Sequence, residues 1–202
     1  MNPKFDPPNP TITDQFFEFY HLYDESPNTI NSQFCFYYEM IFFLSGDVNY
    51  TIEDRHYKLR PGDLLLISKS DTHHADLSSC KPYERIEIYL TDMFFQYMQT
   101  FFQEDFTSCF TDAISKDYRL MRLDNKNIIH LKQLCTRISK AGGNAKIGNT
   151  ALICAYLMEF LVYVNRAYYD ALDSIKDDIT PSPKINQLIA FINDNLTEDL
   201  SL

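Results

Sequence analysis

The sequence predicts an α+β fold in which an antiparallel β-barrel comes first and a helical region follows it. About six or seven short strand-like segments lie close together before Leu90 with no helical pattern between them, which is typical of an antiparallel sandwich or barrel. After Leu90 the apolar residues follow the helical repeat instead. The chain also contains 16 Phe and 14 Tyr, so we expect a core or a cavity lined by these rings.

The expected strands are rich in aromatic and β-branched residues and are separated by turn residues. They cover residues 16–23, 34–44, 48–52, 55–59, 64–67 and 83–90. Pro61-Gly62 suits the centre of a type II turn, because proline fixes φ and glycine tolerates a positive φ. In the last strand, strict alternation places Tyr83, Arg85 and Glu87 on one face and the isoleucines on the other.

Three helices are expected after the barrel, over residues 93–102, 127–140 and 147–172. Gly142-Gly143 marks the end of the second helix. The third helix is apolar around most of its circumference, so it must be covered on more than one side. A barrel can cover one side, and a neighbouring helix or a second subunit is needed for the other.

The end of the chain predicts the start of another domain. Residues 175–183 have the composition of a linker, and Ser182-Pro183 suits the first positions of a helix. The apolar residues of 185–196 then follow a regular helical stripe. We therefore expect the chain to be part of a longer protein.

Composition excludes several classes of function. The formal net charge of −10 argues that this chain alone does not bind a phosphate backbone. The N-terminus lacks the apolar stretch of a signal peptide, and the longest nearly apolar run, residues 151–164, is shorter than the roughly 20 residues of a membrane span. We therefore expect no membrane partner. The five scattered cysteines, in a chain without a secretion signal, indicate free thiols and hence a cytoplasmic location.

Several motifs occur in a characteristic order along the chain. They are Glu39 with Gly46, residues 57–67 (YKLRPGDLLLI), His73-His74, residues 83–90 (YERIEIYL) and residues 184–202 (KINQLIAFINDNLTEDLSL). The first four resemble the N-terminal sensor domain of AraC-family transcription regulators, a cupin-type barrel (double-stranded β-helix) followed by dimerising helices. The last is similar to the opening helix of that family's DNA-binding domain, which contains two helix-turn-helix units.

The resemblance implies a division of the chain into four parts. Residues 1–91 would be the barrel sensor, 92–174 the helical dimerisation region, 175–183 the linker and 184–202 the first helix of a truncated helix-turn-helix domain. It also implies a function: a small-molecule effector in the barrel would modulate DNA binding by the C-terminal domain that this chain lacks.

Cupin enzymes hold a metal at positions that correspond here to Gln33, Cys35, Glu39 and His73. Only Glu39 and His73 keep the ligand type, whereas a catalytic metal needs at least three protein ligands. We therefore expect no catalytic residues, no metal and no cofactor. The alternative is a stand-alone cupin metalloenzyme, an isomerase or a dioxygenase.

The expected ligand-binding residues lie at these four positions and on the facing strand, and Tyr37 is added because it shares their face by the alternation of a strand. They are Gln33, Cys35, Tyr37, Glu39, His73, Tyr83, Arg85 and Glu87. An arginine among rings suits a polar ligand, for example a carboxylate or a phosphate. Two alternatives stay open: Arg85 and Glu87 could form a solvated surface pair, and the barrel could be an empty structural module.

A homodimer is expected through the longest helix. Leu152, Tyr156, Glu159 and Tyr163 are spaced by four, three and four residues and form one stripe. The family pairs its subunits through helices after the barrel, so the resemblance implies that this stripe contacts a second subunit. The alternative is that the stripe packs within one subunit.

Overall fold

A computed structural model describes residues 16–25, 33–77, 81–143 and 146–178, with backbone only for Gln33 and residues 172–178. The linker residues 179–183 and the expected helix 184–202 lie outside the described residues. The chain divides into two compact units at Tyr168, and the described part of the second unit is the end of one helix.

The predicted fold class is confirmed, because the described chain consists of antiparallel strands followed mainly by helices. The strands are β1 (Phe17–Asp24), β2 (Gln33–Phe34), β3 (Tyr38–Ser45), β4 (Asn49–Ile52), β5 (Arg55–Lys58), β6 (Asp63–Ile67), β7 (Thr72–Asp76), β8 (Tyr83–Leu90) and β9 (Leu120–Arg122). The helices are α1 (Asp92–Phe102), α2 (Ser108–Ser115), α3 (Asn125–Gly142) and α4 (Asn149–Asp178).

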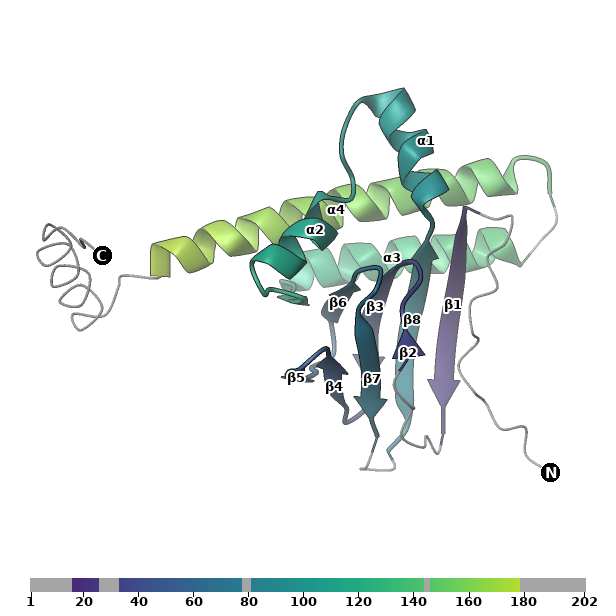
Figure 1. Ribbon diagram of the computed structural model, residues 1–202. Coiled ribbons are helices and arrows are strands. Elements are labelled where there is room, and N and C mark those ends of the chain that lie inside the picture. Colours follow the sequence, from purple (N-terminus) through teal and green to yellow (C-terminus); the bar gives the residue numbers. More distant parts are fainter. Residues whose placement is uncertain (1–15, 26–32, 78–80, 144–145, 179–202) are drawn as a thin grey trace, which may run out of the picture. The chain divides into compact units, whose positions relative to one another are not determined.

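The strands form two antiparallel sheets that face each other (Figure 1). The five-stranded sheet has the order β1-β8-β3-β6-β9, and the four-stranded sheet has the order β2-β7-β4-β5. The turn at Gly62 is built as the sequence predicts, with a φ of 97° and a hydrogen bond from the amide of Asp63 to the carbonyl of Arg60. Strand β1 is an edge strand, a position that matters for the cavity described below.

The central strands β8, β3 and β6 of the five-stranded sheet are buried on both faces. The inner face of this sheet carries Ile41, Phe43 and Tyr83, which belong to the apolar core of the barrel. Its outer face carries alternate residues such as Phe42 and Ile88, which are fully buried. Helices α3 and α4 run across the side of this outer face (Figure 1), and each helix has buried apolar residues of its own.

The single strand predicted over residues 34–44 is wrong. The chain leaves β2 at Cys35 and enters β3 at Tyr38, and in doing so it passes from one sheet to the other. Between them, the backbone of Cys35 is hydrogen-bonded to the loop between β6 and β7, through Ser70 and Asp71. An aromatic run therefore looked continuous in sequence although its two ends pair with different strands.

Other elements also differ from the prediction. Helix α2 and strands β7 and β9 were not predicted, because each is short and has no clear periodicity. Strand β9 pairs with β6, so a segment assigned to the helical region completes a barrel sheet. Helix α4 continues to Asp178, and residues 175–178 of the predicted linker are therefore helical.

Over Asn149–Ala171, helix α4 is long and apolar enough to cross a membrane by length and composition alone. Core helices of globular domains pass the same test. Leu157, Phe160 and Val164 are fully buried, and Asn165 accepts hydrogen bonds from Ser108 and the amide of Cys109 at the start of α2. These contacts are those of a helix in a folded domain.

Candidate ligand-binding site

The alternating residues of β8 that we predicted to face inward do so. Residues directly opposite in an antiparallel pair share a face, and β3 places Phe43 opposite Arg85 and Ile41 opposite Glu87. Both apolar partners belong to the barrel core. Arg85 is 2% exposed and Glu87 is 4% exposed, so the interpretation of these two residues as a solvated surface pair is wrong.

Arg85 is the centre of a buried polar cluster, which we call the arginine cluster: Arg85, Asp24, Glu87, Tyr83 and Tyr89. The guanidinium donates from Nε to Glu87 Oε1 and from Nη1 to Asp24 Oδ2, each at 2.6 Å. It also lies 4.3 Å from the centre of the Tyr83 ring, and Tyr89 donates to Glu87 Oε2 at 3.0 Å. Charge-assisted hydrogen bonds of this kind are stronger than neutral ones.

A second buried cluster lies on β3, β7 and the chain between β2 and β3. His73 Nε2 is 3.3 Å from Glu39 Oε2, and the thiol of Cys35 is 3.7 Å from the same oxygen. Burial, followed by the charge of Glu87, raises the pKa of Glu39 to about 8. Burial lowers the pKa of His73 to about 4. At neutral pH the carboxyl is therefore mainly protonated and the imidazole is neutral.

Several buried polar atoms in the barrel lack a hydrogen-bond partner among the described residues. They include the hydroxyl of Tyr83 and both ring nitrogens of His73, of which Nε2 lies 3.3 Å from Glu39 Oε2. Tyr83 is fully buried in the core and His73 stacks on Tyr50, with ring centres 6.0 Å apart. Buried polar groups in folded proteins normally have a partner, so a small molecule or ordered water is expected to supply it.

The residues at the cupin metal positions do not fit a metal. Within the described part of the chain, no group of three or more His, Cys, Asp or Glu side chains has the geometry of a metal site. Burial raises the pKa of Cys35 far above neutral, so in the metal-free chain this side chain is a thiol. Glu39 is also mainly protonated at neutral pH, which leaves His73 as the one ready donor of the three.

Two predicted binding residues are placed less clearly than the others. Of Gln33 only the backbone is described, and it pairs with His73 on β7. Tyr37 lies in the break between β2 and β3, so the alternation argument for its direction does not apply; its side chain is half-buried. Its carbonyl accepts a bond from the Cys35 thiol at 2.9 Å.

Sequence reasoning missed Asp24 and left Tyr89 out of the site. Tyr89 follows Glu87 by two residues on the same face, so the alternation of β8 could have identified it. Asp24 becomes a partner of Arg85 only because β1 pairs with β8, and no local pattern indicates that pairing. The edge strand also brings Tyr20 to 6.1 Å from the Tyr89 ring.

Three of the four residues predicted at a dimer interface contact α3 of the same subunit. Glu159 Oε1 is 3.1 Å from His130 Nε2, and the ring centres of Tyr163 and His130 are 4.0 Å apart. The ring of Tyr156 lies 5.8 Å from the guanidinium of Arg137. Leu152 is exposed.

A larger exposed apolar face lies on α1. We call it the α1 face: Met93, Tyr97, Phe101 and Phe102, each about half exposed or more. Phe16 packs against Tyr97, with ring centres 5.7 Å apart. The four residues of the face carry no charge, in a chain whose net charge is −10.

Comparisons with known proteins agree with this barrel. A family model described as "AraC-like ligand binding domain" matches residues 33–161. No curated protein matches the chain. The solved structures that resemble it do so over a limited part of its length and at low identity.

Two of these structures are cupins. One is an RmlC-like cupin with a double-stranded β-helix fold from Methanocaldococcus jannaschii (10% identity, 37% of this chain and 70% of that chain, TM-score 0.34). Another is a cupin 2 conserved barrel protein from Salinispora arenicola (10% identity, 41% and 70%, TM-score 0.36). A third is salicylate 1,2-dioxygenase from Pseudaminobacter salicylatoxidans (20% identity, 42% and 24%, TM-score 0.35).

Proposed function

Because the chain belongs to the family of AraC-like ligand-binding domains, we propose that it is the effector-sensing and dimerising part of an AraC-type transcription regulator. The observation that supports an effector in the barrel is the set of buried, unpartnered polar atoms on Tyr83 and His73. An effector that binds one arrangement of the regulator better than another shifts the balance between them. DNA would be bound by the C-terminal domain, whose expected first helix, 184–202, stays a prediction.

The effector is an uncharged molecule that carries hydroxyl groups. Arg85 was expected to bind a carboxylate or a phosphate, but its Nε and Nη1 donate to Glu87 and Asp24 instead. An anionic effector at this guanidinium would lie beside these two carboxylates and be repelled by both. Hydroxyl groups can instead pair with the Tyr83 hydroxyl and with His73 without adding charge.

Ligand-induced stabilisation tests this proposal. Uncharged sugars and polyols, screened against the corresponding sugar acids, are expected to raise the unfolding midpoint of the chain, since a ligand that binds only the folded state stabilises it. Tyr83→Phe removes a hydroxyl that has no partner, so the variant should fold as well as the parent. It should nevertheless weaken binding roughly tenfold, as expected when one hydrogen bond of the ligand is lost.

Tyr156→Phe is the matched control, because this tyrosine lies on α4 against Arg137 and away from the barrel. It should bind the ligand like the parent. A larger stabilisation by the sugar acids, or equal binding by Tyr83→Phe and the parent, would contradict the proposal.

The rival function is a stand-alone cupin metalloenzyme, for which the chain would have to purify with a stoichiometric transition metal. Elemental analysis of the purified protein separates the two functions. A metal that is held through Glu39 and His73, and lost in Glu39→Gln, would favour the enzyme.

Dimerisation is the second part of the proposal, and the α1 face is the better contact for a second copy of this chain. Two chains of net charge −10 repel each other, so they meet most favourably where the surface is uncharged. The interface predicted on α4 offers mainly Leu152, since its other members contact α3.

Sedimentation velocity distinguishes the two surfaces. The parent chain is expected to sediment as a dimer and Phe101→Glu as a monomer, because the substitution buries a charge in the apolar contact. Leu152→Glu, a change of similar size at another exposed apolar position, should remain dimeric. The reverse result would restore the interface predicted from the sequence.

A further inference from the structure

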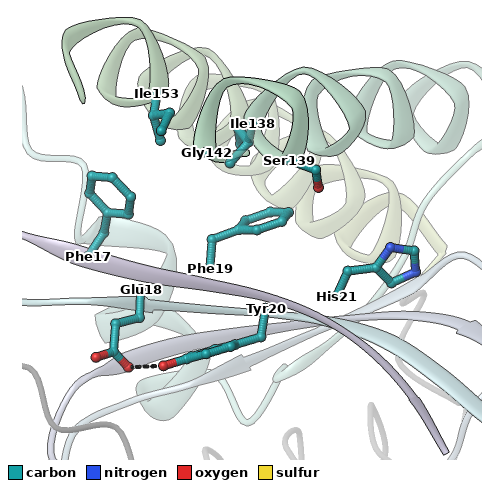
Figure 2. A pocket seen from close by; sticks show the side chains of 9 residues that line it. All are labelled: Phe17, Glu18, Phe19, Tyr20, His21, Ile138, Ser139, Gly142 and Ile153. Carbon is teal, nitrogen blue, oxygen red and sulfur yellow. Dashed lines mark hydrogen bonds between the residues drawn. The ribbon is translucent and has the colours of Figure 1, made fainter. Parts of the chain in front are cut away.

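A cavity of about 500 Å³ lies outside the barrel, between strand β1 and helices α3 and α4. Figure 2 shows Phe17 and Phe19 pointing from β1 toward the helices, while Ile138 and Ile153 approach from the opposite side. The volume falls within the range of small-molecule sites, roughly 300–1,000 Å³. Because β1 is an edge strand, the cavity lies at the margin of the sheet.

Gly142 supplies independent evidence of free space at this position. It lines the cavity near the end of α3, and a Cβ atom added to it would meet no other atom within 4 Å. A small residue at this point therefore leaves the cavity open. At Gly62, by contrast, there is no free space, because an added Cβ would clash with the side chain of Ile128.

The lining combines apolar walls with one polar end. Two phenylalanine rings and two isoleucines surround the body of the cavity, which suits a flat apolar molecule. Ser139 and His21 lie together at one end (Figure 2) and offer a hydroxyl and an imidazole. Glu18 and Tyr20 also border the cavity, but their side chains point to the other side of β1 (Figure 2) and bond to each other.

The charges around the cavity limit the charge of the ligand that it can bind. Among the described residues that line the cavity there is no lysine or arginine. The carboxylate of Glu84 lies 2.8 Å from His21 Nε2, so an anion placed at the polar end would meet a negative neighbour. A hydroxyl group can bond to Ser139 without this cost.

We propose that this cavity is a second small-molecule site, separate from the barrel, for an uncharged aromatic compound that bears a hydroxyl group. Such a ligand contacts the sheet through Phe17 and Phe19 and both helices through Ile138 and Ile153. It therefore binds the state in which the helices lie on the sheet and stabilises that state. Helix α4, which leads toward the C-terminal part of the chain, forms one wall, so occupancy can be sensed there.

Isothermal titration of the full chain with 2-naphthol, and with 2-naphthoate as its charged counterpart, tests the site. The parent should bind 2-naphthol roughly tenfold more tightly than 2-naphthoate. Gly142→Leu adds a side chain to the cavity lining at a position where a Cβ meets no other atom, and it should weaken 2-naphthol binding at least about tenfold. Gly143→Leu is the matched control, because its added Cβ makes only ordinary contacts and it does not line the cavity.

Ser139→Leu gives a second block from an exposed position, should Gly142→Leu not fold. Equal affinities in Gly142→Leu and Gly143→Leu, or no 2-naphthol binding by the parent, would overturn the proposal. So would binding that Tyr83→Phe abolishes and Gly142→Leu does not, since the probe would then occupy the barrel. Binding that appears only after residues 1–15 are removed would show that the chain itself fills the cavity and would also overturn it.

Discussion

Arg85→Met is expected to lower the free energy of unfolding by about 3–5 kcal/mol, the largest single-residue effect that we predict for this chain. The methionine fills a similar volume but leaves Glu87 and Asp24 without the guanidinium that joins them. Glu87 is 4% exposed, so its charge would remain in the core without a cationic partner. Urea unfolding, followed by circular dichroism, measures the loss.

Arg55→Met provides the comparison. Arg55 also pairs with an aspartate, Asp117, but both side chains are largely exposed. Surface pairs of this kind contribute roughly 0–1 kcal/mol, so this variant should unfold almost like the parent. A loss below about 1 kcal/mol for Arg85→Met would mean that the arginine cluster does not hold the barrel together.

The second prediction concerns pH, because Glu39 and His73 shift in opposite directions. The pKa of Glu39 is about 8 in the folded chain against 4.5 for an exposed glutamate. Its contribution to the free energy of unfolding is therefore complete below pH 4.5 and is lost as pH rises to about 8. The pKa of His73 is about 4 in the folded chain against 6.5 for an exposed histidine. Its contribution to the free energy of unfolding is therefore complete above pH 6.5 and is lost as pH falls toward 4.

The two contributions oppose each other between pH 4.5 and 6.5, and above pH 6.5 only that of Glu39 changes. The free energy of unfolding should therefore fall between pH 6.5 and 8, by at most about 1.4 kcal/mol per pH unit. In Glu39→Gln this alkaline fall should disappear. The His73 contribution is then no longer opposed, so the variant should lose stability as pH drops below 6.5.

Urea unfolding at a series of pH values compares the parent with Glu39→Gln and with Glu104→Gln, in which the changed glutamate is exposed. Glu104→Gln should reproduce the parental profile. An alkaline fall that persists in Glu39→Gln would show that another group is responsible.

Local sequence signals account for most of the fold. The strict alternation of residues 83–90 matches β8 residue for residue, and the Pro61-Gly62 turn and the end of α3 at Gly142-Gly143 lie where the sequence places them. These features depend on neighbours in the chain, on the period of apolar residues and on the φ angles that glycine and proline allow. Strand β9 was missed because three residues carry no usable period.

The candidate site was predictable only in part. Period-two alternation identified Arg85 and Glu87 and even their face, but not that Asp24 and Glu87 already bind the guanidinium. That pairing is the basis of our proposal of an uncharged effector, and its Asp24 contact depends on the register of β1 against β8. Tyr37 was predicted to face inward by the same alternation, but this argument does not apply, because the change of sheet breaks the strand at this residue.

The sequence by itself determined the class of fold, the order of barrel and helices, and the inward face of β8, because these follow from local periodicity and turn chemistry. Only the tertiary structure decided which charged side chains pair with each other, which polar atoms lack a partner, and that a cavity lies between β1 and α3. These properties arise between residues far apart in the chain. Strand register, burial and the packing of helix on sheet set them, and a single sequence contains no direct record of those distances.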